Sequence, residues 1–131
     1  KFVLISPKEL SVPDYIKTDY LKETGMEYIE TDDMEAAMPQ LDILYMTRIQ
    51  RERFFSEDEY LKYKDAFILD TDKLENAKQD LTIMHPLPRV NEITTAVDDD
   101  PRAKYFEQAR NGKYIRMALI ITLLKWGGAL S

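Results

Sequence analysis

Short apolar runs alternate along this chain with longer stretches that have helical spacing or composition. The apolar runs predict strands at residues 2–5, 26–29, 43–46, 66–69 and 81–84. The stretches between them predict helices at residues 13–24, 32–38, 56–64 and 72–78. Because single helices separate short strands, the pattern predicts βαβ units, and hence an α/β fold built on a parallel sheet with right-handed crossovers.

Residues typical of helix ends support several of these boundaries. Gly25 follows the first predicted helix, where a left-handed glycine commonly ends a helix. Ser56 and Glu59 have the spacing of a capping box, in which each side chain bonds to the backbone N–H of the other residue. Asp72 and Glu75 repeat that spacing, so we expect them to begin the helix at 72–78.

The last predicted helix, over residues 113–126, is apolar on more than one side. Its two apolar stripes consist of Tyr114, Met117, Ala118, Ile121 and Leu124, and of Ile115, Leu119, Leu123 and Trp126. Because a surface helix of a single domain shows one stripe, we expect this helix to be buried against another copy of the chain or a second domain. The chain opens on a strand at Lys1 rather than on Met, which favours a second domain and a longer parent polypeptide.

Composition narrows the class of protein. The chain has 131 residues, 44% of them apolar, and its 24 acidic and 18 basic residues give a net charge of -6, which indicates a globular domain and argues against nucleic-acid binding. It has no cysteine and one histidine, so disulfides, thiolate chemistry and a histidine-rich metal site are excluded. Its glycines form neither a dinucleotide-binding fingerprint nor a P-loop. No apolar run approaches the ~20 residues of a membrane span, and we expect a cytoplasmic protein without a membrane partner. The acidic run 98–100 predicts a solvated helix start.

Candidate ligand-binding residues follow the strands, because ligands of open parallel α/β sheets bind beyond the carboxyl ends of the strands. Arg48 and Gln50 follow the strand predicted at 43–46 and point to the same side if the extended geometry continues. A guanidinium binds a carboxylate through two charge-assisted hydrogen bonds, and an amide adds a neutral donor and acceptor. This pair suits a dicarboxylate or an amino acid. The alternative is a charged loop with surface ion pairs.

A second candidate loop, His85-Pro86-Leu87-Pro88-Arg89, follows the last predicted strand. The two prolines end the strand and remove two backbone donors, so the carbonyl groups of Pro86 and Leu87 are available to an NH or NH2 group of a ligand. The Leu87–Pro88 bond is a candidate cis peptide. His85 is either a general base or, as is more common for a lone histidine at a strand end, a structural hydrogen-bonding residue. Arg89 either meets an anion or anchors the loop.

Two motifs, at residues 44–54 (LYMTRIQRERF) and 84–93 (MHPLPRVNEI), closely resemble the aspartate carbamoyltransferase catalytic chain, and the helical ending at residues 111–119 is similar as well. The likeness covers essentially the whole chain and corresponds to most of the family's aspartate-binding domain. It implies a three-layer αβα Rossmann-like domain, one of two in a transcarbamoylase. Residues 1–131 would then form an incomplete aspartate-binding domain, without the N-terminal carbamoyl phosphate domain and without the first strand of their own domain.

The resemblance also implies an activity and binding residues. The family joins carbamoyl phosphate to L-aspartate, giving N-carbamoyl-L-aspartate and phosphate, an early step of pyrimidine biosynthesis. Arg48 and Gln50 would hold the aspartate carboxylates, Pro86 and Leu87 would offer carbonyls to the carbamoyl nitrogen, and the loop after Gln50 would shift on domain closure. The family further implies a homotrimer with shared active sites, sometimes a zinc-bearing regulatory chain, and neither a metal nor an organic cofactor in this domain.

Several motifs of the family are absent from this sequence. The Ser-Thr-Arg-Thr-Arg loop, the His-Pro-x-Gln segment and a Gly-Arg-Thr turn do not occur, so we expect no catalytic residue here and no activity from this chain alone. The sibling ornithine carbamoyltransferases fit less well, because they carry Cys where Pro86 stands and a Ser-Met-Gly loop. The alternative function is a non-catalytic amino-acid-binding or assembly module derived from a transcarbamoylase.

Overall fold

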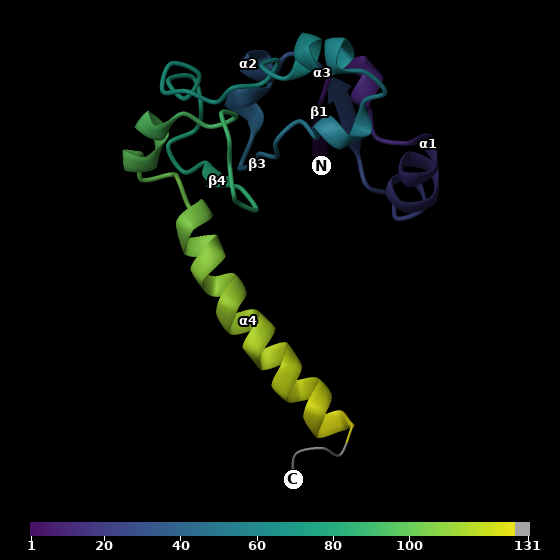
Figure 1. The fold of residues 1–131 in the computed structure, drawn as a ribbon, viewed down its shortest axis with the longest axis vertical. Helices are drawn as coiled ribbons and strands as arrows, with labels where there is room; N and C mark the ends of the chain where they lie inside the picture. The colour runs from purple at the N-terminus through teal and green to yellow at the C-terminus, as the bar shows by residue number, and fades with distance from the viewer. Residues whose placement is uncertain (128–131) are drawn as a thin grey trace.

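The computed structural model describes residues 1–127, apart from the side chain of Arg53, and its strands form two parallel pairs (Figure 1). Strand β1 (Phe2–Ile5) pairs with β2 (Tyr28–Thr31), and β3 (Ile43–Tyr45) pairs with β4 (Thr82–Met84). The predicted parallel α/β architecture is confirmed. The strands nevertheless form two two-stranded sheets rather than one continuous sheet, and β2 begins two residues later than the run 26–29 predicts.

Helical segments of different length connect the strands. In chain order they are η1 (Lys8–Leu10), α1 (Asp14–Ile16), η2 (Lys17–Lys22), α2 (Met34–Ala37), η3 (Met38–Gln40), η4 (Arg51–Arg53), α3 (Glu57–Tyr63), η5 (Thr95–Asp99) and α4 (Tyr105–Trp126). The helix predicted at 13–24 continues from α1 into the π-helical η2, and Gly25 follows it with a φ of 68°. The Ser56 hydroxyl caps α3 by accepting a hydrogen bond from the Glu59 N–H at 3.2 Å, which confirms the Ser56 half of the predicted capping box.

Two predicted elements are wrong. The apolar run 66–69 is not a strand, because only Leu69 pairs, through an isolated parallel bridge to Ile93. Residues 72–76 form successive turns, and residues 77 and 78 are not helical either. The Asp70 carboxylate accepts a hydrogen bond from the backbone N–H three residues later at 3.0 Å and pairs with the ammonium group of that residue at 2.6 Å. Such local side-chain bonds favour a turn over a helix.

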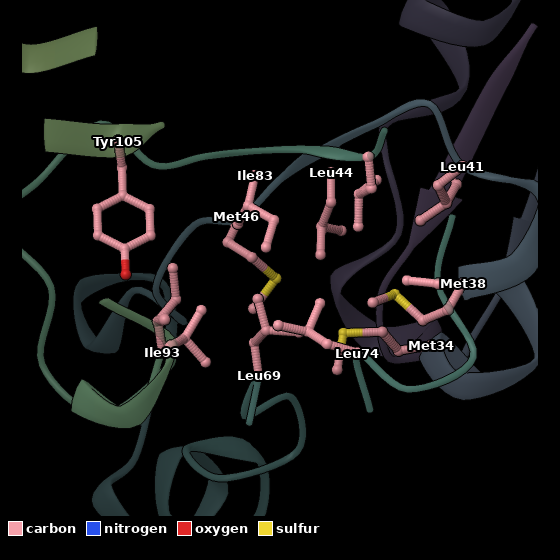
Figure 2. Close-up of a cluster of buried hydrophobic side chains, with 13 residues drawn as sticks. Met34, Met38, Leu41, Leu44, Met46, Leu69, Leu74, Ile83, Ile93 and Tyr105 are labelled. Carbon is pink, nitrogen blue, oxygen red and sulfur yellow. The ribbon is translucent and has the colours of Figure 1, made fainter. Parts of the chain in front are cut away.

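The hydrophobic core packs around the β3–β4 pair and the chain that follows β4. Figure 2 shows side chains from β3, β4, α2 and the start of α4 gathered in one cluster. The buried members are Met34, Met38, Leu41, Leu44, Met46, Leu69, Leu74, Ala77, Leu81, Ile83, Ile93, Val97 and Tyr105. Burying a large apolar side chain stabilises a fold by roughly 1.5–3 kcal/mol. This core therefore fixes the strands from which both candidate loops emerge.

Helix α4 extends away from the remainder of the molecule (Figure 1). It begins at Tyr105 rather than at 113, and Tyr105 is its one buried residue. Both predicted apolar stripes are exposed; for example, Ile115 is 68% and Trp126 is 83% accessible. A helix with this much exposed apolar surface indicates an interaction surface.

Candidate functional site

The loops after β3 and β4 leave the sheet at the same edge. Tyr45 is paired with Met84 in parallel register, and the Met46 N–H donates a hydrogen bond to the Met84 carbonyl at 2.9 Å. The carboxyl ends of neighbouring parallel strands face the same way. Residues 47–50 and 85–89, which carry the predicted binding groups, therefore start side by side.

Arg48 and Gln50 are exposed on the first loop. The Arg48 guanidinium donates hydrogen bonds to both Glu52 carboxylate oxygens, at 2.6 Å and 3.3 Å, so the surface ion pair considered as the alternative is present. The hydrogen bond and charge of Glu52 raise the pKa of Arg48, and the charge of Glu92 on the second loop acts in the same direction. Arg48 is thus a cation within electrostatic range of the second loop.

The second loop presents two carbonyl groups that have no partner in the described part of the chain. Among the described groups of residues 1–127, which leave out the Arg53 side chain, none donates a hydrogen bond to the carbonyl oxygen of Pro86 or of Leu87. Pro86 and Pro88 have no N–H, and the Leu87 N–H donates to His85 Nδ1 at 2.8 Å. Leu87 has a φ of 49°, and the Leu87–Pro88 peptide is cis. The loop therefore offers acceptors and no free backbone donor at 86–88, an arrangement that suits an NH2 group.

The structure places His85 in a structural role. Its Nε2 lies 2.7 Å from a carboxylate oxygen of Glu92, and the two residues are only 1% and 4% exposed. The other Glu92 oxygen accepts hydrogen bonds from the N–H groups of Val90 and Asn91 at 3.0 Å and 3.1 Å. Burial by itself raises the pKa of Glu92, but hydrogen bonds from backbone N–H groups and from His85 outweigh it, so the pKa is lower than usual. Glu92 is not among the residues predicted from the sequence; its one signal is its place directly before the core residue Ile93.

Arg89 anchors the second loop to the segment before α4. Its guanidinium donates hydrogen bonds to both carboxylate oxygens of Asp98 and, at 3.3 Å, to the Tyr105 hydroxyl. The hydrogen bond from Arg89 lowers the pKa of Asp98, while burial and Asp98 raise the pKa of Tyr105 to about 12. Asp100 pairs with Arg102 at 2.7 Å. The expectation of a solvated helix start at 98–100 is therefore wrong, because two of these carboxylates are ion-paired and α4 begins only at Tyr105.

A cavity of about 770 Å³ lies between the two strand pairs. Residues 1–6, which include β1, and residues 40–47, which include β3, form most of its wall. Each of these strands has one strand neighbour within residues 1–127. The backbone groups on the opposite edge of β1 and of β3 therefore have no strand partner in the described part of the chain.

Other kinds of site find no support among the described residues. In residues 1–127, no group of three or more His, Cys, Asp or Glu side chains is arranged to hold a metal ion. Over the same residues no helix, α4 included, has the length and hydropathy of a membrane span.

Comparisons with known sequences agree with the resemblance of the two motifs. Residues 1–123 match the family described as aspartate/ornithine carbamoyltransferase, Asp/Orn binding domain. The aspartate carbamoyltransferase catalytic subunit of Lachnoclostridium phytofermentans is 58% identical over 124 residues, which are 95% of this chain and 40% of the relative. The corresponding subunit of Alkaliphilus metalliredigens is 60% identical over 120 residues, 92% of this chain and 39% of the relative. The chain thus spans about two fifths of the length of these relatives.

Solved structures extend the agreement to the fold. The catalytic subunit of M. jannaschii aspartate transcarbamoylase superposes with a TM-score of 0.82 at 41% identity, over 94% of this chain and 40% of that one. The Trypanosoma cruzi enzyme in complex with carbamoyl phosphate and aspartate gives 0.80 at 36% identity, over 92% and 40%. Sequence and fold agree over nearly the whole chain, which therefore belongs to the aspartate/ornithine carbamoyltransferase family and matches its Asp/Orn-binding domain.

Proposed function

We propose that this chain is the aspartate-binding part of an aspartate carbamoyltransferase, which transfers the carbamoyl group of carbamoyl phosphate to L-aspartate. The observation that carries the proposal is the shared edge of β3 and β4. At this edge Arg48 leaves the sheet together with the carbonyls of Pro86 and Leu87, which have no partner among the described groups. Relatives named aspartate carbamoyltransferase catalytic subunit, at 58% and 60% identity, support it. So does the Trypanosoma cruzi enzyme, whose structure holds carbamoyl phosphate and aspartate.

The proposed reaction assigns a task to each binding group. The aspartate amine attacks the carbamoyl carbon, a C–N bond forms, the C–O bond to phosphate breaks and the amine loses a proton. Arg48 binds one aspartate carboxylate through two parallel hydrogen bonds, and Gln50 adds a neutral donor for the other. The carbonyls of Pro86 and Leu87 accept hydrogen bonds from the carbamoyl NH2 group. Holding two reactants in line supplies about 7–11 kcal/mol in favourable cases, while donors for the phosphate come from outside this segment.

We further propose that residues 1–131 form an incomplete aspartate-binding domain. The cavity between β1 and β3 is bounded by two strand edges without strand partners among residues 1–127. An extended segment placed there would pair with both strands and join the two sheets into one. This is the position proposed for the first strand of the domain, which the present sequence lacks.

Helix α4 is the proposed contact with the carbamoyl phosphate domain. That domain would cover the exposed apolar side chains of α4, such as Ile115, Leu119 and Leu123. Apolar side chains gathered along one helix are unfavourable in water and are typical of a contact surface. The homotrimer with shared active sites, the regulatory chain and the cytoplasmic location stay predictions from the resemblance.

A chimera tests the proposed function. In it, this chain replaces the 124-residue segment that it matches in the Lachnoclostridium phytofermentans subunit; we refer to this chimera as the completed chain. It is expected to form N-carbamoyl-L-aspartate and phosphate from carbamoyl phosphate and L-aspartate, as followed by phosphate release and product mass. Ornithine serves as the competing amine. The proposal is wrong if the unmodified relative is active and the completed chain either prefers ornithine or binds aspartate without turnover, the latter being the behaviour of a non-catalytic module.

A further inference from the structure

The His85–Glu92 pair closes the base of the second loop. His85 directly follows β4, and Glu92 directly precedes Ile93, whose bridge to Leu69 returns the chain to the core. The two side chains are buried and joined by a contact of 2.7 Å between His85 Nε2 and Glu92 Oε1. Residues 86–91 therefore form a loop whose two ends are tied together by one buried polar contact.

Hydrogen-bond partners define the tautomer of His85. The Leu87 N–H donates to Nδ1 at 2.8 Å, so Nδ1 is an acceptor and carries no proton. The proton of the neutral ring is then on Nε2, which donates to Glu92. The N–H groups of Val90 and Asn91 donate to the other oxygen of the Glu92 carboxylate and hold it in place. The anchored carboxylate in turn fixes the orientation of the imidazole through Nε2.

The Leu87 N–H controls the direction of the Pro86 carbonyl. Both groups belong to the same planar trans peptide, in which the N–H and the C=O point in opposite directions. Since the N–H points to His85 Nδ1, the Pro86 carbonyl points away from the imidazole. Leu87 also holds a left-handed φ of 49°, a conformation that costs a non-glycine residue about 1–2 kcal/mol. The bond to Nδ1 helps to hold the residue there.

We infer that His85 and Glu92 are positioning residues, which aim the Pro86 carbonyl at the carbamoyl nitrogen by fixing the Leu87 N–H. Glu92 sets the tautomer of His85, which leaves Nδ1 as an acceptor for the Leu87 N–H. Because this N–H and the Pro86 carbonyl share one peptide plane, fixing the direction of the N–H also fixes that of the carbonyl. Neither side chain touches a reactant. The inference rests on the proposed function, because that function supplies the NH2 group.

Two substitutions in the completed chain separate this positioning role from a structural one. His85→Asn keeps an acceptor oxygen near the position of Nδ1 but leaves the buried Glu92 without its donor. His85→Gln reaches Glu92 with an amide N–H but offers no acceptor to the Leu87 N–H. We expect His85→Gln to raise the KM for carbamoyl phosphate about tenfold, the effect of one lost hydrogen bond, and the KM for aspartate less. His85→Asn should raise the KM for carbamoyl phosphate less than His85→Gln does. The Tm of His85→Asn should nevertheless be the lower of the two, because the buried Glu92 loses its donor.

A matched control removes stability without touching the loop. Arg102→Gln breaks the pair with Asp100 and the hydrogen bonds to the carbonyls of Leu74 and Lys78; it should lower Tm and leave the KM for carbamoyl phosphate unchanged. The inference is overturned if the His85 variant with the lower Tm also has the higher KM for carbamoyl phosphate, or if neither variant changes this KM. A completed chain that is inactive with the native His85 would instead refute the proposed function, and this role with it.

The tautomer offers a check that does not depend on activity. In ¹⁵N NMR spectra of the completed chain with labelled histidine, His85→Asn identifies the signals of His85. We expect an unprotonated Nδ1 and a protonated Nε2. A proton on Nδ1 would overturn the inference.

Discussion

The two loops at the β3–β4 edge are held in different ways. In the second loop, the buried His85–Glu92 pair and three backbone N–H groups fix the backbone. In the first loop, Arg48 is held by Glu52 through hydrogen bonds between side chains that are 42% and 58% exposed. Buried polar networks rigidify a structure, whereas exposed ion pairs contribute little to stability. Under the proposed function, the acceptors for the carbamoyl NH2 group are therefore preset, while Arg48 exchanges Glu52 for a substrate carboxylate.

The largest expected effect follows removal of this cation. Arg48→Ala in the completed chain should raise the KM for aspartate about 100-fold, because a carboxylate loses two charge-assisted hydrogen bonds. Arg48→Lys should restore only part of the loss, since an ammonium group cannot reproduce the planar fork. Steady-state kinetics measures both, and Lys64→Ala, which removes an exposed cation from the end of α3, is the control. An Arg48→Ala variant with the native KM for aspartate would contradict the proposed role of Arg48 as the carboxylate-binding cation.

The same substitution in each loop compares how firmly the two are held. Glu92→Gln should lower the free energy of unfolding of the completed chain by about 2 kcal/mol, because a buried carboxylate that accepts three hydrogen bonds is replaced by an amide. Glu52→Gln, in the exposed pair, should change it by about 0.5 kcal/mol or less. Urea titrations measure both values. Equal losses would mean that the first loop is held as firmly as the second.

Acid should weaken the second loop and its anchor. The pKa values of Glu92 and Asp98 are lowered in the folded chain, so these carboxylates stabilise the fold above their unfolded pKa values, and this stabilisation is lost as the pH falls through the folded values. The free energy of unfolding should therefore fall between about pH 5 and pH 2. The difference between the native chain and Asp98→Asn should shrink over the same interval. A constant difference would contradict this account.

A modest effect is expected at the far end of the first loop, where α3 begins. Ser56→Ala removes the acceptor for the Glu59 N–H and should cost about 1 kcal/mol of stability. Ser56→Asp keeps an acceptor and should restore it. Arg48 is held by Glu52 and not by α3. The change in the KM for aspartate, expressed as a free energy, should therefore be smaller than the loss of folding free energy. A large rise in this KM would show that the Ser56 cap positions the first loop.

Local signals allowed much of the fold to be predicted from the sequence. The strands β3 and β4, the Ser56 cap and the stop at Gly25 each depend on a few neighbouring residues. The predictions were wrong where other contacts decide. The apolar run 66–69 resembles a strand, but only Leu69 pairs, through a bridge to Ile93. In the segment predicted as a helix at 72–78, the hydrogen bonds of Asp70 favour turns instead.

The candidate site shows the same division. The positions of Arg48 and Leu87 after parallel strands could be read from the sequence, because both motifs follow apolar runs and the strand ends share one edge. Glu92 could not, because its partner His85 lies seven residues away in a loop without regular periodicity. The start of α4 at Tyr105 was also missed, since residues 105–112 show no apolar stripe.

The most direct test of a single site at this edge is a crystal structure of the completed chain with N-carbamoyl-L-aspartate. The account predicts a product carboxylate about 3 Å from the Arg48 guanidinium, with the carbamoyl NH2 group donating to the carbonyl of Pro86 or Leu87. A product bound elsewhere, with Arg48 still paired to Glu52 and both carbonyls facing solvent, would contradict it.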